Sequence, residues 1–257
     1  MKTENAISEI QSMERAVEKD TFIHRLDPVT KLLVTVAFFG VVLSMGKYNL
    51  GGVIAMSVYI FAGIAAGMIP IRKIIKRCIF IMPVMLLFGL ANIIWDRQTG
   101  IVIGKLCISR GWVSAMVLMV KGMLTVSACY ILIATTGVEG ICAGLRKIRV
   151  SSIIVTQIWL TYRYLLLLAE RAGDIFNAYR LRSLGQRGIN IKAWGPLLGH
   201  LLMSSIDRGQ NVYESMILRG YRGSFPIDTG KSSMKSNLIW TVAWCGVFIA
   251  IRIITGR

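Results

Sequence analysis

Long apolar blocks separated by short polar stretches dominate the hydrophobic pattern of this chain. Most of the blocks approach the ~20 residues that an α-helix needs to cross ~30 Å of hydrocarbon. The pattern therefore predicts an all-α, polytopic membrane protein with about five transmembrane helices. The blocks lie at about 31–45, 50–69, 78–95, 112–136, 153–169 and 237–254.

The block at 153–169 breaks the expected alternation of sides, because both of its flanks are basic. Clusters of Lys and Arg mark the cytoplasmic ends of membrane helices. The loops "PIRKIIKR" (70–77) and "LRKIRV" (145–150) are therefore expected in the cytoplasm, as is the arginine-rich stretch after 153–169. We expect 153–169 to run along or dip into the cytoplasmic side without spanning. The N-terminus then lies inside and the C-terminus outside.

Four regions follow from this arrangement. Residues 1–30 form an N-terminal interfacial segment, in which charges alternate with apolar residues at helical spacing. Residues 31–136 form a four-helix transmembrane region, 137–236 a cytoplasm-facing region of long helices, and 237–257 a C-terminal transmembrane helix. Asp27-Pro28 predicts the start of a helix, because an acidic cap followed by proline is typical of helix N-termini.

Composition agrees with a membrane protein and adds a strong positive charge. Hydrophobic residues make up 54% of the 257 residues, and charged residues 17%, against roughly 25% in soluble domains. Lys and Arg number 30 against 13 Asp and Glu, which gives a net charge of +17. Such an excess indicates cytoplasmic loops and contact with anionic lipid headgroups. Nucleic acid is not an expected partner, because the arginines are interleaved with membrane-length apolar blocks.

The basic region contains an internal repeat with an offset of 37 residues. Glu170-Arg171 matches Asp207-Arg208, and Leu181-Arg182-Ser183 matches Leu218-Arg219-Gly220. Repeats of this length indicate two copies of one structural unit. Each copy is expected to be a helix that ends at its second arginine, with Gly185 and Gly220 acting as stop signals.

The spacing within each copy places four residues on one helical face, because eleven residues make about three turns. The small residue of each set, Ala178 or Ser215, would let two helices approach closely. An arginine in a last helical turn commonly complements the helix dipole and caps carbonyls. Two matched copies favour instead a pair of docking sites for a symmetric partner. The two faces are Arg171, Ile175, Ala178 and Arg182, and Arg208, Val212, Ser215 and Arg219.

Three stretches resemble the transmembrane T component of energy-coupling factor transporters, in particular its cobalt-type branch, CbiQ. "HRLDPVTKLL" (24–33) is similar to the family's N-terminal signature. "LTYRYLLLLAERAGDIFNAYRLRS" (160–183) and "SSIDRGQNVYESMILRGYRG" (204–223) are similar to its two coupling segments. The resemblance covers nearly the whole chain.

The resemblance implies a non-catalytic subunit in the cytoplasmic membrane of a prokaryote. Two cytoplasmic ATP-binding-cassette ATPases, which bind ATP and Mg²⁺, would receive the two arginine motifs in grooves. A separate membrane S component would capture the substrate, with cobalt expected first, nickel next and a vitamin as a further alternative through a shared S component. Both motifs here lack the family's alanine, and the first also lacks its glycine. The motifs that correspond by position are Leu181-Arg182-Ser183 and Leu218-Arg219-Gly220.

The sequence offers no catalytic or cofactor site of its own. It contains no GxxxxGK[ST] phosphate loop and no metal-like cluster around its two histidines, His24 and His200. Lys121, inside an apolar block, is either a functional charge or a lysine satisfied by carbonyls. A membrane-embedded lipid-modifying enzyme would need convergent carboxylates, and a stand-alone carrier would need polar residues along several spans. These two functions are the alternatives.

Overall fold

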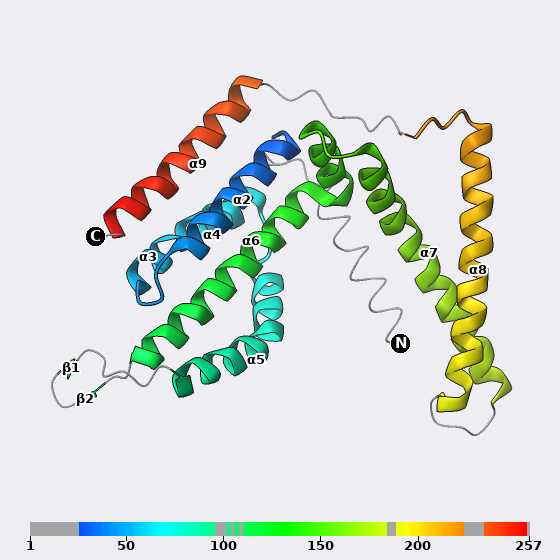
Figure 1. Cartoon of the computed structure of the whole chain (residues 1–257), viewed down its shortest axis with the longest axis horizontal. Helices are drawn as coiled ribbons and strands as arrows, with labels where there is room; N and C mark the ends of the chain where they lie inside the picture. The colour runs from blue at the N-terminus through cyan, green and yellow to red at the C-terminus, as the bar shows by residue number, and fades with distance from the viewer. Residues whose placement is uncertain are drawn as a thin grey trace. The chain divides into compact units, whose positions relative to one another are not determined.

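The computed structural model describes residues 26–95, 102–103, 106–107, 110–183, 189–223 and 234–255 (Figure 1). The predicted interfacial segment over 3–24, His24 and Gly185 lie outside the described residues. Internal contacts divide the chain into two compact units. Within the described residues, unit 1 runs from Leu145 to Gly223, and unit 2 comprises 26–144 and the C-terminal helix.

The described chain is almost entirely helical, as the hydrophobic pattern predicts. Its strands are the two-residue β1 and β2, which pair antiparallel. In chain order the elements are α2 (Pro28–Ser44), α3 (Leu50–Ala55), α4 (Ser57–Gly67), α5 (Ile71–Trp95), β1 (Val102–Ile103), β2 (Leu106–Cys107), α6 (Arg110–Lys147), α7 (Ser152–Arg182), α8 (Ile191–Leu218) and α9 (Met234–Thr255).

Within the described residues, five helical segments are long and apolar enough to cross a membrane, which supports a multi-pass membrane protein. The number of candidate spans agrees with the sequence prediction, but the helices that make up the five differ. The prediction counted α2, which has only 17 residues, and left out α7. Since α7 continues unbroken beyond the apolar block at 153–169, its length meets the requirement. The five segments are Leu50–Gly67, Ile71–Ile93, Gly111–Lys147, Ser152–Arg182 and Asn237–Thr255.

The prediction of a loop at 70–77 is wrong, because residues 71–77 form the first turns of α5. The N–H of Lys73 donates to the carbonyl of Pro70 at 3.0 Å, where the helix begins. Lys, Arg and Ile tolerate helical backbone well, so the positive charges do not end the helix. Similarly, α6 runs beyond the predicted end at residue 136, through a kink at Gly137 (φ 65°, ψ 169°), to Lys147.

The start of α2 confirms the predicted cap. The Asp27 carboxylate accepts a hydrogen bond from the N–H of Val29 at 3.2 Å, and Pro28 occupies the first turn. The N–H of Asp27 also donates to the Asn237 side chain in α9, at 3.2 Å. At the other end, the Asn49 side chain donates to the carbonyl of Thr255, at 2.6 Å. Contacts at both ends make α2 and α9 parallel neighbours in unit 2 (Figure 1).

An aromatic cluster fills the space between α2, α4 and α9. Phe38 is fully buried, and its ring centroid lies 4.7 Å from that of Tyr59 and 5.6 Å from that of Phe248. Trp244 packs edge-on against Tyr59 with centroids 5.0 Å apart. Buried aromatic pairs in tilted and T-shaped arrangements contribute beyond their buried area. This cluster is therefore expected to hold the C-terminal helix on the rest of unit 2.

Two lysine side chains connect α2 to α6, one near the start of α2 and one at its C-terminal end. The Lys31 ammonium, in a residue only 8% exposed, donates to the carbonyl of Thr135 at 2.9 Å, two residues before the kink at Gly137. The Lys121 ammonium donates to the carbonyl of Met45, the C-cap of α2, at 2.6 Å. The C-terminal end of a helix carries carbonyls without intrahelical donors and a negative partial charge, so Lys121 caps α2. Of the two predicted roles for Lys121, the structure supports the lysine satisfied by a carbonyl.

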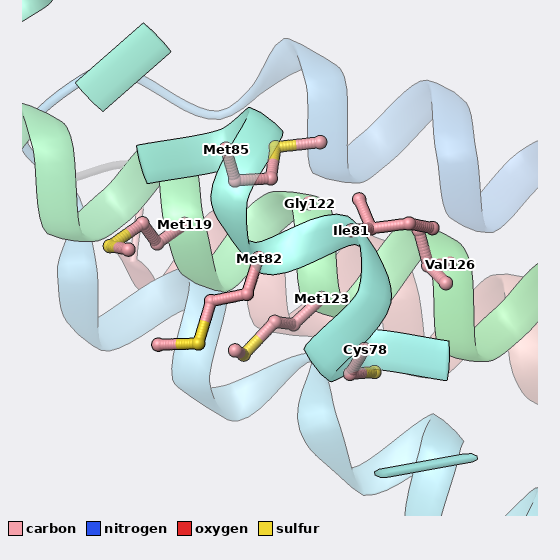
Figure 2. A pocket seen from close by; sticks show the side chains of 8 residues that line it. All are labelled: Cys78, Ile81, Met82, Met85, Met119, Gly122, Met123 and Val126. Carbon is pink, nitrogen blue, oxygen red and sulfur yellow. The ribbon is translucent and has the colours of Figure 1, made fainter. Parts of the chain in front are cut away.

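Sulfur-bearing side chains gather between α5 and α6 (Figure 2). They surround a cavity of about 10 Å³, hardly the volume of one water molecule. A Cβ at Gly122 would lie 2.5 Å from the Met85 sulfur, so the glycine provides the space for that side chain. Methionine fills irregular apolar gaps well, and these side chains fill the space between the two helices. The lining residues are Cys78, Ile81, Met82, Met85, Met119, Gly122, Met123 and Val126.

Candidate functional site

Unit 1 contains a hairpin of two long helices, α7 and α8, which contact each other and run in opposite directions. Near the connection between them, the Phe176 and Trp194 rings meet with centroids 5.5 Å apart. At the far end, the Ser152 hydroxyl donates to the carbonyl of Gly223 at 3.2 Å. α7 has 31 residues at 1.5 Å each and is therefore about 45 Å long. The Phe176–Trp194 contact lies near one end of the hairpin and the Ser152–Gly223 contact at the other.

The second arginine motif closes α8 with a well-defined stop. The N–H of Tyr221 donates to the carbonyl of Met216 at 3.0 Å, and the N–H of Gly220 to the carbonyl of Ile217 at 2.9 Å. This pair of bonds is the Schellman motif, which requires a left-handed residue after the helix cap. Gly220 supplies it with φ +81°, so the predicted glycine stop is confirmed here.

The first motif ends α7 differently. Ser183 caps the helix with φ −97°, and its N–H donates to the carbonyl of Tyr179 at 2.9 Å. No left-handed residue is needed at this position, which explains why serine can stand where the second copy has glycine. The departure from the family's motif at Ser183 is therefore compatible with a helix that ends at Arg182.

Both motifs present an exposed leucine beside an exposed arginine. Leu181 is 78% exposed and Leu218 88% exposed, and both arginines lie on the surface of unit 1. Neither the Arg182 nor the Arg219 guanidinium forms a hydrogen bond or an ion pair with another described residue. These arginines do not cap described carbonyls of their own helices, although their charges still complement the helix dipoles. We name Leu181-Arg182-Ser183 the α7 tip and Leu218-Arg219-Gly220 the α8 tip.

The hairpin separates the two tips. The α7 tip lies at the connected end, near the Phe176–Trp194 contact, whereas the α8 tip lies at the end marked by Ser152 and Gly223. By the length of α7, the tips stand on the order of 40 Å apart. One unit therefore offers two similar, separate projections.

A central groove between α7 and α8 brings the two repeats together. Glu170-Arg171 of the first copy and Asp207-Arg208 of the second all line this groove, which has a volume of about 840 Å³. The predicted face of the second copy is also found, because its four residues line one adjoining groove: Arg208, Val212, Ser215 and Arg219. The structure thus pairs the acid–arginine elements while it keeps the tips apart.

The predicted close crossing at small residues is not seen within the described hairpin. Ala178 and Ser215 are both exposed. The Ser215 hydroxyl donates to the carbonyl of Asn211, one turn earlier in its own helix, at 2.7 Å. The contact between helices is made instead by large rings, Phe176 and Trp194. A role of the small residues as helix support stays a prediction.

Sequence reasoning missed the groove that adjoins the α8 tip. It has a volume of about 650 Å³, and its walls include Trp159 and Arg163 of α7. The Arg163 guanidinium lies 5.5 Å from the centroid of the Trp159 ring, a cation–π contact. Their spacing of four residues, one helical turn, was the available signal.

A model of the CbiQ family, described as cobalt transport protein, matches residues 19–229. That match includes both tips and most of the membrane-length helices. The chain belongs to the CbiQ family. Among its relatives is the energy-coupling factor transporter transmembrane protein EcfT of Lacticaseibacillus paracasei, 28% identical over 228 residues that cover 81% of this chain and 84% of the relative.

Two further relatives of this CbiQ-family chain carry the same name. The protein of Lactococcus lactis is 24% identical over 82% of this chain and 84% of its own length. The protein of Listeria innocua is 23% identical over 94% of both chains. The similarity therefore extends over nearly whole proteins, in agreement with the resemblance seen in the sequence.

The remaining candidate residues do not form a second site in the described part of the CbiQ-family chain. His200 is exposed on α8. No group of three or more His, Cys, Asp or Glu side chains that could hold a metal ion occurs among the described residues. Asp174 and Glu214 form no ion pair with other described residues.

Proposed function

We propose that this chain is the transmembrane coupling (T) subunit of an energy-coupling factor importer. The observation that carries the proposal is the pair of exposed Leu-Arg tips, fixed at opposite ends of one helical hairpin. Each tip docks into one of two cytoplasmic ATPase subunits. Arginine suits this role, because its planar guanidinium binds carboxylates and backbone carbonyls in a fixed geometry.

The leucine beside each arginine contributes an apolar anchor. Burying a leucine side chain stabilises an interface by roughly 1.5–3 kcal/mol, and both leucines are highly exposed in the free chain. Arginine is one of the residues enriched at interface hot spots, and the leucine adds apolar area beside it. The tips therefore bind partners and perform no chemistry of their own.

Transport follows from the stiffness of the hairpin. ATP-driven closing and opening of the ATPase dimer changes the separation of its two docking grooves, and the tips follow that change. The long helices α7 and α8 carry the motion to a membrane S component that captures the substrate. The ATPases bind ATP and Mg²⁺, while this subunit transmits the work.

Cobalt is the proposed cargo, in agreement with the description of the family that the chain matches, and nickel is the next candidate. The S component selects the ion. The subunit lies in the cytoplasmic membrane of a prokaryote, where its long apolar helices cross the bilayer.

Uptake in reconstituted vesicles tests this function. We expect ATP-dependent ⁵⁷Co²⁺ uptake when this chain is combined with its ATPase pair and an S component, and none when any one of them is left out. A chain that transports cobalt by itself would contradict the proposal and support a stand-alone carrier. Competition by Ni²⁺ against ⁵⁷Co²⁺ decides between the two candidate cargoes.

A further inference from the structure

The groove beside the α8 tip is positively charged. We name it the tip groove, and its walls come from the first half of α7 and the second half of α8. Three arginines line it, Arg163, Arg208 and Arg219, and no acidic side chain occurs among its described lining residues. The adjoining central groove, in contrast, contains Glu170, Asp174 and Asp207 beside its arginines. The lining of the tip groove is therefore net positive, and Arg208 stands where this groove adjoins the central one.

These arginines are available to a ligand. Arg208 and Arg219 form no hydrogen bond or ion pair with other described residues, and both are exposed. Arg163 stacks on Trp159 through its face, which leaves the N–H edges of the guanidinium open. Guanidinium groups bind phosphate oxygens in a bidentate manner, with charge-assisted hydrogen bonds. The tip groove therefore fits a phosphate-bearing anion.

The surroundings of the groove indicate where that phosphate comes from. The first half of α7 is apolar enough to lie in a membrane, and its residues Ile153, Ile154 and Ile158 are 72%, 54% and 41% exposed. Trp159, Tyr164 and Tyr221 line the groove itself. Trp and Tyr are enriched at the level of lipid headgroups, where one end of the ring is apolar and the other wet. A soluble anion would need none of this apolar margin.

We propose that the tip groove binds the headgroup of an anionic phospholipid. Arg163 and Arg208 hold the phosphate, Trp159 orients Arg163, and the apolar side chains Leu160 and Met216 contact the first carbons of the lipid tails. The lipid lies beside the root of the α8 tip and neutralises part of the charge around Arg219. This inference concerns lipid binding by the chain alone and does not rest on the proposed function.

Native mass spectrometry of the full-length chain in detergent, titrated with phosphatidylglycerol or phosphatidylcholine, tests the proposal. Each arginine near an anionic headgroup contributes about 1 kcal/mol. We therefore expect Arg163→Gln/Arg208→Gln to bind the first phosphatidylglycerol about thirtyfold more weakly than the unchanged chain. The unchanged chain should prefer phosphatidylglycerol to phosphatidylcholine by a similar factor. Arg219 is left unchanged because it belongs to the α8 tip.

Two further variants serve as controls. Arg180→Gln/Lys192→Gln removes the same charge from exposed positions outside the groove and should bind phosphatidylglycerol like the unchanged chain. Arg163→Lys/Arg208→Lys keeps the charge but loses the bidentate geometry, and should recover most of the affinity, which excludes misfolding as the cause.

The following results would overturn the proposal. They are equal binding of the two lipids, an unaffected Arg163→Gln/Arg208→Gln variant, an equal loss in the charge-matched control, and displacement of the lipid by millimolar glycerol 3-phosphate. The last result would mean that the groove binds a soluble phosphate compound. Displacement by an acidic peptide at the same concentration would likewise assign the groove to a partner protein.

Discussion

Reversing both tip charges, Arg182→Glu with Arg219→Glu, is expected to release the ATPase subunits during co-purification and to abolish ATP-dependent uptake. Removing one charged partner from a buried, hydrogen-bonded interface costs about 2–5 kcal/mol. The tips are far apart, so their effects on binding should be nearly additive. We expect each single change to weaken the association by about thirtyfold or more, and the double change to bring it below detection.

The matched control for this experiment is Arg180→Glu with Arg222→Glu. Both residues are exposed, lie within three residues of a tip arginine and carry the same charge, but neither belongs to a tip. This control should keep the ATPases bound and uptake largely intact. If the tip variant still co-purifies and transports normally, or if the control fails equally, the assignment of the tips as docking elements is wrong.

Phe38→Ala is expected to have the largest effect on stability. Phe38 is fully buried and contacts the rings of Tyr59 and Phe248. Truncating a buried Phe to Ala typically costs 3–5 kcal/mol, because it removes apolar contacts and leaves a cavity. For a chain of this size, such a loss lowers the midpoint of thermal unfolding by about 10 °C. Tryptophan fluorescence of the purified chain in detergent reports the loss, because Trp244 belongs to the same cluster.

Phe61→Ala provides the matched comparison. Phe61 lies on α4, as Tyr59 does, but is 67% exposed in the chain. The same substitution there should shift the unfolding midpoint by no more than about 2 °C, in line with exposed substitutions. Equal shifts for the two variants would mean that the aromatic cluster does not hold unit 2 together.

Features set by neighbouring residues could be predicted from the sequence. Asp27-Pro28 begins a helix as expected, because the cap needs only its own carboxylate and the N–H of Val29. Gly220 ends one, because the left-handed position after a helix favours glycine. The two tips follow from the repeat with its offset of 37 residues. For the cap and the glycine stop the evidence lies within a few residues of the feature, and for the tips it lies in the match between the two copies.

Features that depend on helix ends and pairing could not be predicted. The basic stretch 70–77 was expected to be a loop because positive charge marks the cytoplasmic side, yet charge does not prevent helix formation, and α5 begins there. The capping of Met45 by Lys121 depends on α2 and α6 being neighbours. The tip groove depends on which parts of α7 and α8 face each other.

Chemical cross-linking from the two tips tests the central claim most directly. In a chain whose native cysteines are replaced by serine, Leu181→Cys and Leu218→Cys place one thiol at each tip, at positions 78% and 88% exposed. A short thiol-reactive cross-linker, applied to the assembled complex, should join each cysteine to an ATPase subunit, and the doubly substituted chain should capture two ATPases at once. Thiols that label only from outside the cell, or that stay unlinked in an intact and active complex, would contradict the account.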